Sequence, residues 1–270
     1  MQTSKNLFDR AIIAKRRQRA VQGDLADFLH REAAAQISER LQEIKKSFTN
    51  RAFVGWLPDV WTLEIGAMTA ADDTDTLLLD VAAHDLVIHG LCLHSANDPV
   101  GQLVQARRSL LPDGLMIAAL FGGQTLHELR SSFAKAEAEL EGGISPRVAP
   151  MGDIRDLGGL ISRAGLALPV ADSQKLTVTY ETPLHLMQDL RKMGEVNALT
   201  ERRKTFTRRS TLNRMIEIYT DNFAQADGRI PATFEIVFLT GWAPSATQPK
   251  PLRPGSATTR LADVLNTEEK

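Results

Sequence analysis

The chain has 270 residues, 43% of them hydrophobic and 24% charged, so it is long and apolar enough to bury a core without covalent cross-links. Its 32 basic and 33 acidic residues give a net charge of -1, which provides no global sign of nucleic-acid or membrane binding. The single cysteine, Cys92, excludes an internal disulfide framework and fits a reducing compartment. No apolar run approaches the ~20 residues that a membrane span needs.

The first fifty residues read as a helical segment. Residues 1–20 are basic and amphipathic, which by itself is also typical of an organelle-targeting helix. Because no clear cleavage site follows, we interpret residues 9–22 as a mature first helix and expect a cytoplasmic protein. A second helix is predicted from Asp24, acting as its cap, to about Lys46.

The rest of the chain alternates between strands and helices. Apolar runs predict strands at 51–56, 86–93, 115–122, 174–180 and 232–242. Helical patterns lie at 58–66, 98–110, 125–142 and 151–165, and a helical region runs from 184 to about 223. The central strands are continuously apolar, as in a sheet covered on both faces. The order predicts a doubly wound α/β sheet whose last strand is antiparallel.

These patterns divide the chain into three parts. We expect an N-terminal helical segment at 1–50, an α/β domain at 51–243 with a helical insertion at about 184–223, and an extended C-terminal tail at 244–270. The tail has several prolines and no apolar periodicity.

Two stretches in the middle of the chain resemble class I S-adenosylmethionine-dependent methyltransferases. "HDLVIHGLCLHSANDP" is similar to the fourth strand of that Rossmann-like fold and the histidine after it. "RRSLLPDGLMIAALFGG" is similar to the following helix, turn and fifth strand. The resemblance implies S-adenosylmethionine as cofactor.

Further motifs narrow the resemblance to one subgroup. They are "FDR" at 8–10, "FGGQTLHELR" at 121–130, the stretch 142–165, "LMQDLRKMGEVNAL" at 186–199 and "DGRIPATFEIVFLTGW" at 227–242. The subgroup joins the biotin-pathway carrier-protein methyltransferases to the mitochondrial complex I assembly factor that hydroxylates an arginine of a complex I subunit. The motifs are most similar to the assembly-factor branch.

The sequence departs from this family near its first strand. Family members have a glycine-rich loop after the first strand and an acid that ends the second, and both contact the cofactor. Only 33 residues separate Phe53 from Leu86, which is enough for about one ~30-residue crossover. We therefore place the first strand at 51–56, followed by a shortened helix. We expect the second strand, with its ribose-binding acid, to be missing.

Candidate cofactor-binding residues are Gly55, Asp72, Asp73, His89 and His94. Gly55 could be a relic of the cofactor loop, but we favour the interpretation that it simply ends a strand. The resemblance places an acid near the adenine amine at residues 72–73, where two exposed turn acids are the alternative. His94 matches the family's histidine after the fourth strand, and a structural, hydrogen-bonded histidine is its competitor.

Candidate substrate-binding residues follow the fifth strand, and they are Phe121, Gly122, Gly123, Thr125, Glu128 and Arg130. Two glycines at the end of a strand permit close backbone approach, and the following helix N-terminus favours an anion. A solvated helix face is the alternative for Glu128 and Arg130. No metal site is expected, because histidines and the cysteine do not cluster at ligand spacing.

A basic run between residues 191 and 214 contains eight arginines and lysines. Such a run is usually a solvated face. It lacks the interleaved aromatic residues of a nucleic-acid platform, so its better functional interpretation is docking to an acidic protein surface.

Three functions remain open at the level of sequence. The first is an S-adenosylmethionine-dependent methyltransferase with a lost or atypical cofactor pocket. The second is a non-methylating complex I assembly factor that acts on a protein partner such as a respiratory-complex subunit, by arginine hydroxylation or as a chaperone. The third is a binding module without a small-molecule ligand. The sequence leaves open whether the chain is an enzyme.

Overall fold

A computed structural model describes residues 6–248, and the predicted tail beyond residue 248 lies outside the described residues. Two helices come first, α1 (Arg10–Gln22) and α2 (Phe28–Glu43). The Asp9 side chain caps α1 by accepting a hydrogen bond from the Ile12 N–H. The predicted start of the second helix was wrong, because α2 begins after Asp27. Asp24 instead pairs with Lys192 at 2.6 Å.

A six-stranded sheet forms the centre of the described chain, in the order β2-β1-β3-β4-β6-β5. The strands are β1 (Arg51–Gly55), β2 (Thr69–Ala71), β3 (His84–Gly90), β4 (Leu110–Phe121), β5 (Ala167–Tyr180) and β6 (Ile230–Trp242). The first four are parallel, whereas β6 runs antiparallel to both β4 and β5. The predicted doubly wound sheet with an antiparallel last strand is confirmed.

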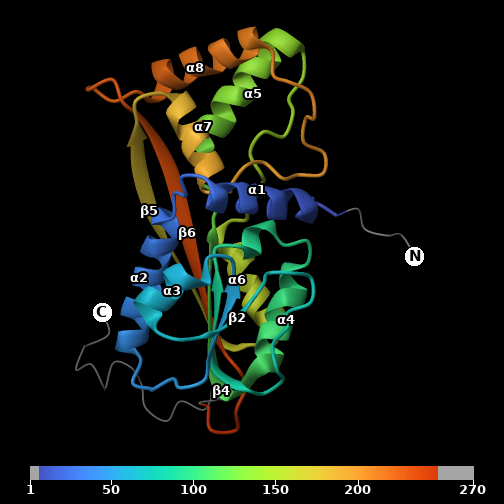
Figure 1. Ribbon diagram of the computed structural model, residues 1–270, viewed down its shortest axis with the longest axis vertical. Helices are drawn as coiled ribbons and strands as arrows, with labels where there is room; N and C mark the ends of the chain where they lie inside the picture. The colour runs from blue at the N-terminus through green and yellow to red at the C-terminus, as the bar shows by residue number, and fades with distance from the viewer. Residues whose placement is uncertain (1–5, 249–270) are drawn as a thin grey trace, which may run out of the picture.

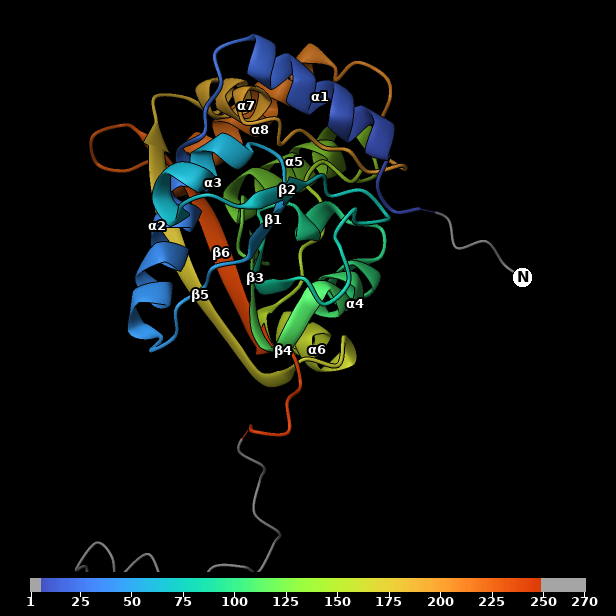
Figure 2. The same ribbon diagram turned by 60° about the horizontal axis from the view of Figure 1, so that its bottom comes forward.

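Helices cover both faces of this sheet (Figures 1 and 2). They are α3 (Pro58–Ile65), the short 3-10 helix η1 (Leu93–Ser95), α4 (Pro99–Ser109), α5 (His127–Glu141), α6 (Ile154–Arg163), α7 (Pro183–Lys192) and α8 (Arg209–Phe223). Figure 2 shows α2 and α3 on one side of the sheet and α4 and α6 on the other. Neighbouring strand residues alternate between the two cores: Phe53 and Ile88 pack toward α2 and α3, and Val54 and Val87 toward α4 and α6.

The shortening near the first strands is visible in the sheet. The predicted first strand and shortened helix correspond to β1 and α3. Only β2, three residues long, lies between α3 and β3 within the described chain, and it pairs directly with β1. The second strand, which we expected to be missing, is thus present as the three-residue β2, and the fold lacks one of the three strands expected before β3. The interval of 33 residues leaves room for one crossover helix and one remnant strand.

Some predicted elements differ from the structure. The residues between the predicted helix at 98–110 and the predicted strand at 115–122 lie inside β4 as a bulge, with Asp113 at φ +60°, because pairing with β3 shifts from Leu110 to Leu115 there. Strand β5 begins at Ala167, seven residues before its predicted start. The helical region expected to continue to 223 is interrupted. After α7, the chain at 193–208 has neither helix nor strand, and α8 begins at Arg209.

Candidate functional site

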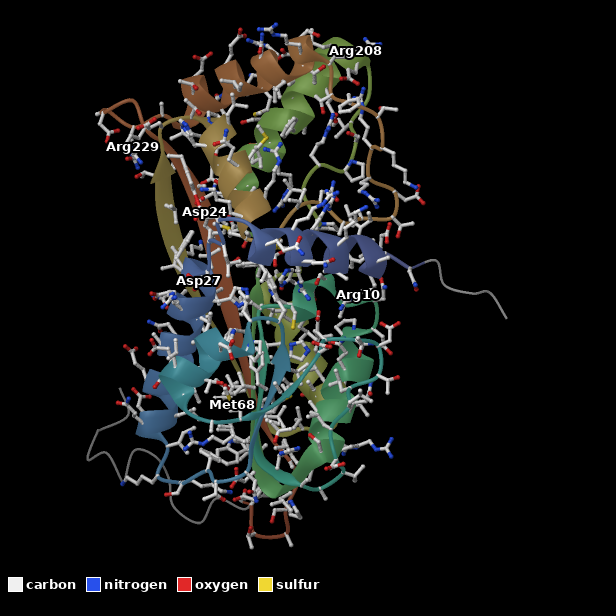
Figure 3. All side chains as sticks on the ribbon, in the orientation of Figure 1. Arg10, Asp24, Asp27, Met68, Arg208 and Arg229 are labelled. Atoms are coloured by element: carbon white, nitrogen blue, oxygen red, sulfur yellow. The ribbon has the colours of Figure 1, made fainter. Side chains whose placement is uncertain are left out.

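Helix α1 lies across the carboxyl ends of the parallel strands, which is the ligand-binding end of such sheets. Figure 1 shows it between β2 and β4 below and α5, α7 and α8 above, while β5 and β6 run up past it, and Figure 3 marks Arg10 at the start of this helix. The Phe8 backbone fixes its entry, because Asn97 both accepts from the Phe8 N–H at 2.8 Å and donates to its carbonyl at 3.1 Å. The helix therefore covers the site at which a cofactor would be expected.

Asp73, which we expected to contact the cofactor, forms ion pairs with two arginines of α1. Its carboxylate accepts from the Arg17 guanidinium at 2.7 Å and from that of Arg10 at 2.9 Å. The Asp73 side chain is 7% exposed. Burial alone would raise the pKa of Asp73, but the two adjacent arginines outweigh it and hold the pKa below its ordinary value. Asp73 is thus a charged, internally neutralised group.

Aromatic rings fill the space beside the strand ends. Gly55 and Gly90 are paired across β1 and β3, and Trp61 of α3 is completely buried next to them. A Cβ on Gly90 would lie 2.5 Å from the Phe53 ring and 2.8 Å from the Trp61 ring. These two glycines therefore make room for the protein's own aromatic side chains.

The residues present do not fit S-adenosylmethionine in the family's usual position. Asp73, one of the acids that the resemblance places near the adenine amine, is paired with Arg17, whose guanidinium also lies 5.2 Å above the Trp56 ring. Aromatic rings, such as that of Trp61 beside Gly90, occupy the space in which the protein backbone would have to approach the cofactor closely. Asp72, the neighbouring candidate, is exposed.

His89 is completely buried within the sheet, in β3. Its Nε2 lies 2.8 Å from the Gln102 Oε1, and its Nδ1 lies 3.4 Å from the Cys92 Sγ. Burial lowers the pKa of His89 to about 4, and burial likewise lowers the pKa of His30 to about 4. The His30 Nδ1 accepts a hydrogen bond from the Trp61 indole N–H at 3.2 Å. Both histidines are therefore neutral in the folded protein at neutral pH.

This pair of neutral histidines predicts a loss of stability in mild acid. An unfolded histidine titrates near ~6.5, so below that pH the unfolded chain binds protons that the folded chain refuses until about pH 4. We expect the free energy of unfolding to fall by up to ~1.4 kcal/mol per pH unit for each histidine across that window. Chemical denaturation at a series of pH values measures the slope.

His89→Gln should remove about half of that slope, since one of two buried groups is lost. His185→Gln is the matched control, because His185 is exposed. An unchanged slope in His89→Gln would mean that His89 does not titrate with folding.

A cavity of about 790 Å³ lies next to this filled region, between α1, α5, α7 and the irregular segment 193–208. Its volume is within the usual range of ligand pockets. Apolar side chains from β4, α5 and β6 form its floor, including Phe121, Leu129, Phe133 and Phe234. Arginines and a lysine surround it. Among the predicted site residues, the cavity brings together His94, Phe121 and Thr125.

His94 and Glu195 meet at the inner end of this cavity. The His94 Nε2 lies 3.4 Å from the Glu195 Oε2, and the His94 ring centroid lies 4.7 Å from that of Phe121, with the two rings tilted by 51°. The His94 side chain is 5% exposed, and its Nδ1 is buried without a hydrogen-bond partner. Burial raises the pKa of Glu195, but the contact with His94 and the charge of Arg17 outweigh burial and lower it. A charged carboxylate therefore lines the cavity beside an imidazole.

The other predicted substrate residues lie outside the cavity and hold the turn after β4. The Glu128 carboxylate accepts from the Thr233 hydroxyl at 2.5 Å, and Arg130 donates to the carbonyls of Gly123 and Thr125 at 3.1 and 2.9 Å. Gly122 packs on Glu235, where a Cβ would lie 2.7 Å from the carboxylate. These contacts position Phe121 and Thr125, which do line the cavity.

Sequence reasoning missed three residues of this region, Arg17, Trp61 and Glu195. Glu195 lies in "LMQDLRKMGEVNAL", one of the motifs that carry the family resemblance, so the sequence did contain a signal that this residue matters. Arg17 looked like part of a basic amphipathic helix, and Trp61 like part of a shortened helix. Neither had a local signal for a contact with Asp73 or Gly90, because those partners are distant along the chain.

The comparisons with known proteins agree with this fold. No family model matches the chain. It is 33% identical over 290 residues to arginine-hydroxylase NDUFAF5, mitochondrial, of Danio rerio, covering 96% of this chain and 89% of that protein. The Mus musculus protein of the same name is 33% identical over 300 residues, covering 98% and 87%. The chain belongs to the arginine-hydroxylase NDUFAF5 family.

More distant relatives confirm the wider resemblance. Malonyl-[acyl-carrier protein] O-methyltransferase of Xylella fastidiosa is 33% identical over 174 residues, covering 64% of this chain and 57% of that enzyme. A solved structure named as a type II methyltransferase, from Anaeromyxobacter dehalogenans, shares the fold, with a TM-score of 0.50 and 13% identity. It covers 78% of this chain and 96% of that one. The predicted class I methyltransferase fold is thus confirmed.

Two further properties concern location and metals. The names of the NDUFAF5 relatives include the word mitochondrial, and no helix within residues 6–248 is both long and apolar enough to cross a bilayer. The expected cytoplasmic location stays a prediction. In the same part of the chain, no three His, Cys, Asp or Glu side chains form a group that could hold a metal ion.

Proposed function

We propose that this NDUFAF5-family chain is a non-methylating relative that binds a protein partner in the cavity beside His94. The observation that carries the proposal is the ion pair between Arg17 and Asp73, 2.7 Å apart and buried at the strand ends. It places a cation of the chain's own α1 on the acid that the family resemblance assigns to the cofactor. The adjoining cavity of about 790 Å³ is open to a ligand.

The names of the relatives support a protein as the partner. One group consists of arginine hydroxylases, and the other acts on a malonyl-[acyl-carrier protein]. The family resemblance adds a respiratory complex I subunit as the specific candidate. A reducing compartment suits this role, since Cys92 is buried and unbridged; we keep the cytoplasm as the proposed location.

A methyltransferase that binds its cofactor in an unusual place is the second candidate. His94, the residue that matches the family's histidine after the fourth strand, lines the cavity, and the cavity is large enough for a cofactor. In this alternative, S-adenosylmethionine would enter beside His94 and Glu195 instead of at Gly55 and Asp73.

Calorimetry with S-adenosylmethionine and its homocysteine product separates the two candidates. We expect no binding heat up to about 1 mM ligand, because Asp73 is already neutralised and Trp61 fills the strand ends. Micromolar binding would overturn the non-methylating proposal. Denaturation midpoints measured with and without ligand provide an independent check, since a bound ligand stabilises the fold.

The partner-binding part of the proposal has its own test. The full chain should retain a complex I subunit in a pull-down with purified components. Failure to retain any such subunit would contradict the proposed assembly-factor function, whatever the result of the calorimetry.

A further inference from the structure

The mouth of the cavity carries an unusual set of exposed side chains. Phe206 is 100% exposed and Leu184 is 41% exposed, and both line the opening. Arg191 and Lys204, also exposed, stand in the same lining. We call these four residues the cavity mouth. Large apolar side chains gathered at a hollow surface mark interaction sites more often than isolated ones do.

Most of the other cations of the lining are neutralised within the chain. Four arginines have carboxylate partners: Arg17 with Asp73, Arg147 with Glu137, Arg202 with Asp9, and Arg203 with Glu141. Arg202 and Arg203 belong to the basic run at 191–214, for which the sequence left a solvated face or docking as interpretations. The charges of all four arginines are therefore unavailable to a partner.

Three lining cations have no carboxylate within ion-pair distance in the described chain, and they are Arg16, Arg191 and Lys204. The half-buried Arg16 guanidinium donates to the backbone carbonyls of Val196 and Asn197. Burial and the charge of Arg202 lower the pKa of Arg16. These three side chains therefore add positive charge to the lining that no carboxylate of the described chain contacts at ion-pair distance.

Negative charge in the lining is limited to one residue. Glu195 is the single acidic side chain among the cavity-lining residues of the described chain, and His94 contacts it at the inner end. The apolar floor, with Phe121, Leu129 and Phe133, lies below the cations. A complementary occupant has an apolar part for the floor and carboxylates for the mouth.

We propose that the cavity mouth binds an acidic protein segment which inserts an apolar side chain onto the floor and places carboxylates against Arg16, Arg191 and Lys204. This inference rests on the proposed function and specifies the chemistry of its partner. The segment would contact Phe206 and Leu184 as it enters, removing their exposed apolar surface from water.

Peptide binding to the full chain tests this chemistry. The probe is a fluorescein-labelled peptide of alternating leucine and glutamate, followed by fluorescence anisotropy. We expect saturable binding that weakens as salt is added, because exposed charges are screened. A peptide with lysine in place of glutamate should bind at least about tenfold more weakly, since like charges then meet at the mouth.

Charge reversal in the protein completes the test. The double variant Arg191→Glu, Lys204→Glu should weaken the acidic peptide by at least about tenfold. The matched control, Arg108→Glu with Arg163→Glu, changes net charge equally at exposed positions on α4 and α6, and should bind as the wild type does. Phe206→Ala should also weaken binding, because the Phe206 ring is fully exposed in the free protein and its apolar contact with the peptide would be lost.

The outcomes separate this inference from the proposed function. If the wild type retains a complex I subunit and the double charge reversal retains it equally well, the inference is overturned while the proposed function stands. Equal binding of the acidic and basic peptides, or absence of acidic-peptide binding, also overturns it. The inference is supported if the double variant loses binding of both the subunit and the acidic peptide while the matched control keeps both.

Discussion

Replacing Asp73 by asparagine should lower the free energy of unfolding by about 3–5 kcal/mol, the usual cost of removing one partner of a buried ion pair. The side chain of Arg17 is only 10% exposed, and it would keep its charge without a counter-ion. Asparagine preserves the volume, so the loss comes from charge and not from a cavity. Urea denaturation of the full chain measures it.

Asp72→Asn is the matched control, because the neighbouring Asp72 is exposed and should change stability by under ~0.5 kcal/mol. The acid response gives a second readout. The folded pKa of Asp73 is lowered, so its stabilising effect is present above its unfolded pKa near ~3.9 and is lost as pH falls through the folded value. Asp73→Asn should lack this acid-dependent component. A variant as stable as the wild type would contradict the assignment of Asp73 as the anchor of α1.

Replacing Trp61 by alanine should cost about 3–5 kcal/mol, as expected when a buried aromatic ring is removed from a close-packed core. Trp61 is completely buried, its ring centroid lies 5.3 Å from that of Phe53, and its N–H is bonded to His30. The variant loses the apolar contacts, opens a cavity beside Gly90 and leaves the His30 Nδ1 without its donor. Thermal or urea unfolding measures the loss.

Leu63→Ala on the same helix is the control for Trp61, since Leu63 is 76% exposed and contributes little burial. A cost below about 1 kcal/mol for Trp61→Ala would show that the strand ends remain filled without the indole. Together, the Asp73 and Trp61 substitutions test whether the carboxyl ends of the parallel strands form a packed core, with Asp73 supplying the polar part and Trp61 the apolar part.

The packing of the strand ends changes where this fold can bind a ligand. In a doubly wound sheet the carboxyl ends of the strands normally expose backbone to a ligand. Here α1 lies across them, with Arg10 and Arg17 bound to Asp73. The open volume lies on the other side of α1, toward α5 and α7, where His94 is reached from the cavity. We therefore expect ligand binding to depend on the cavity and not on the strand-end glycines.

The sequence alone determined the fold class and most of its order. Continuous apolar strands at residues 86–93 and 115–122 indicated a sheet covered on both faces, because each strand must bury two sides. The short interval between Phe53 and Leu86 indicated a missing strand, because chain length limits the number of crossovers. These inferences need only local pattern and distance along the chain.

The tertiary structure decided which candidate residues meet. Asp73 and Arg17 are 56 residues apart and form an ion pair, and His94 and Glu195 are 101 residues apart and form another contact. No local pattern encodes such pairs, since each depends on where α1 and the segment after α7 dock. Tertiary packing also separated the two histidine candidates: His89 lies in the core of the sheet, whereas His94, just after the same strand, lines the cavity.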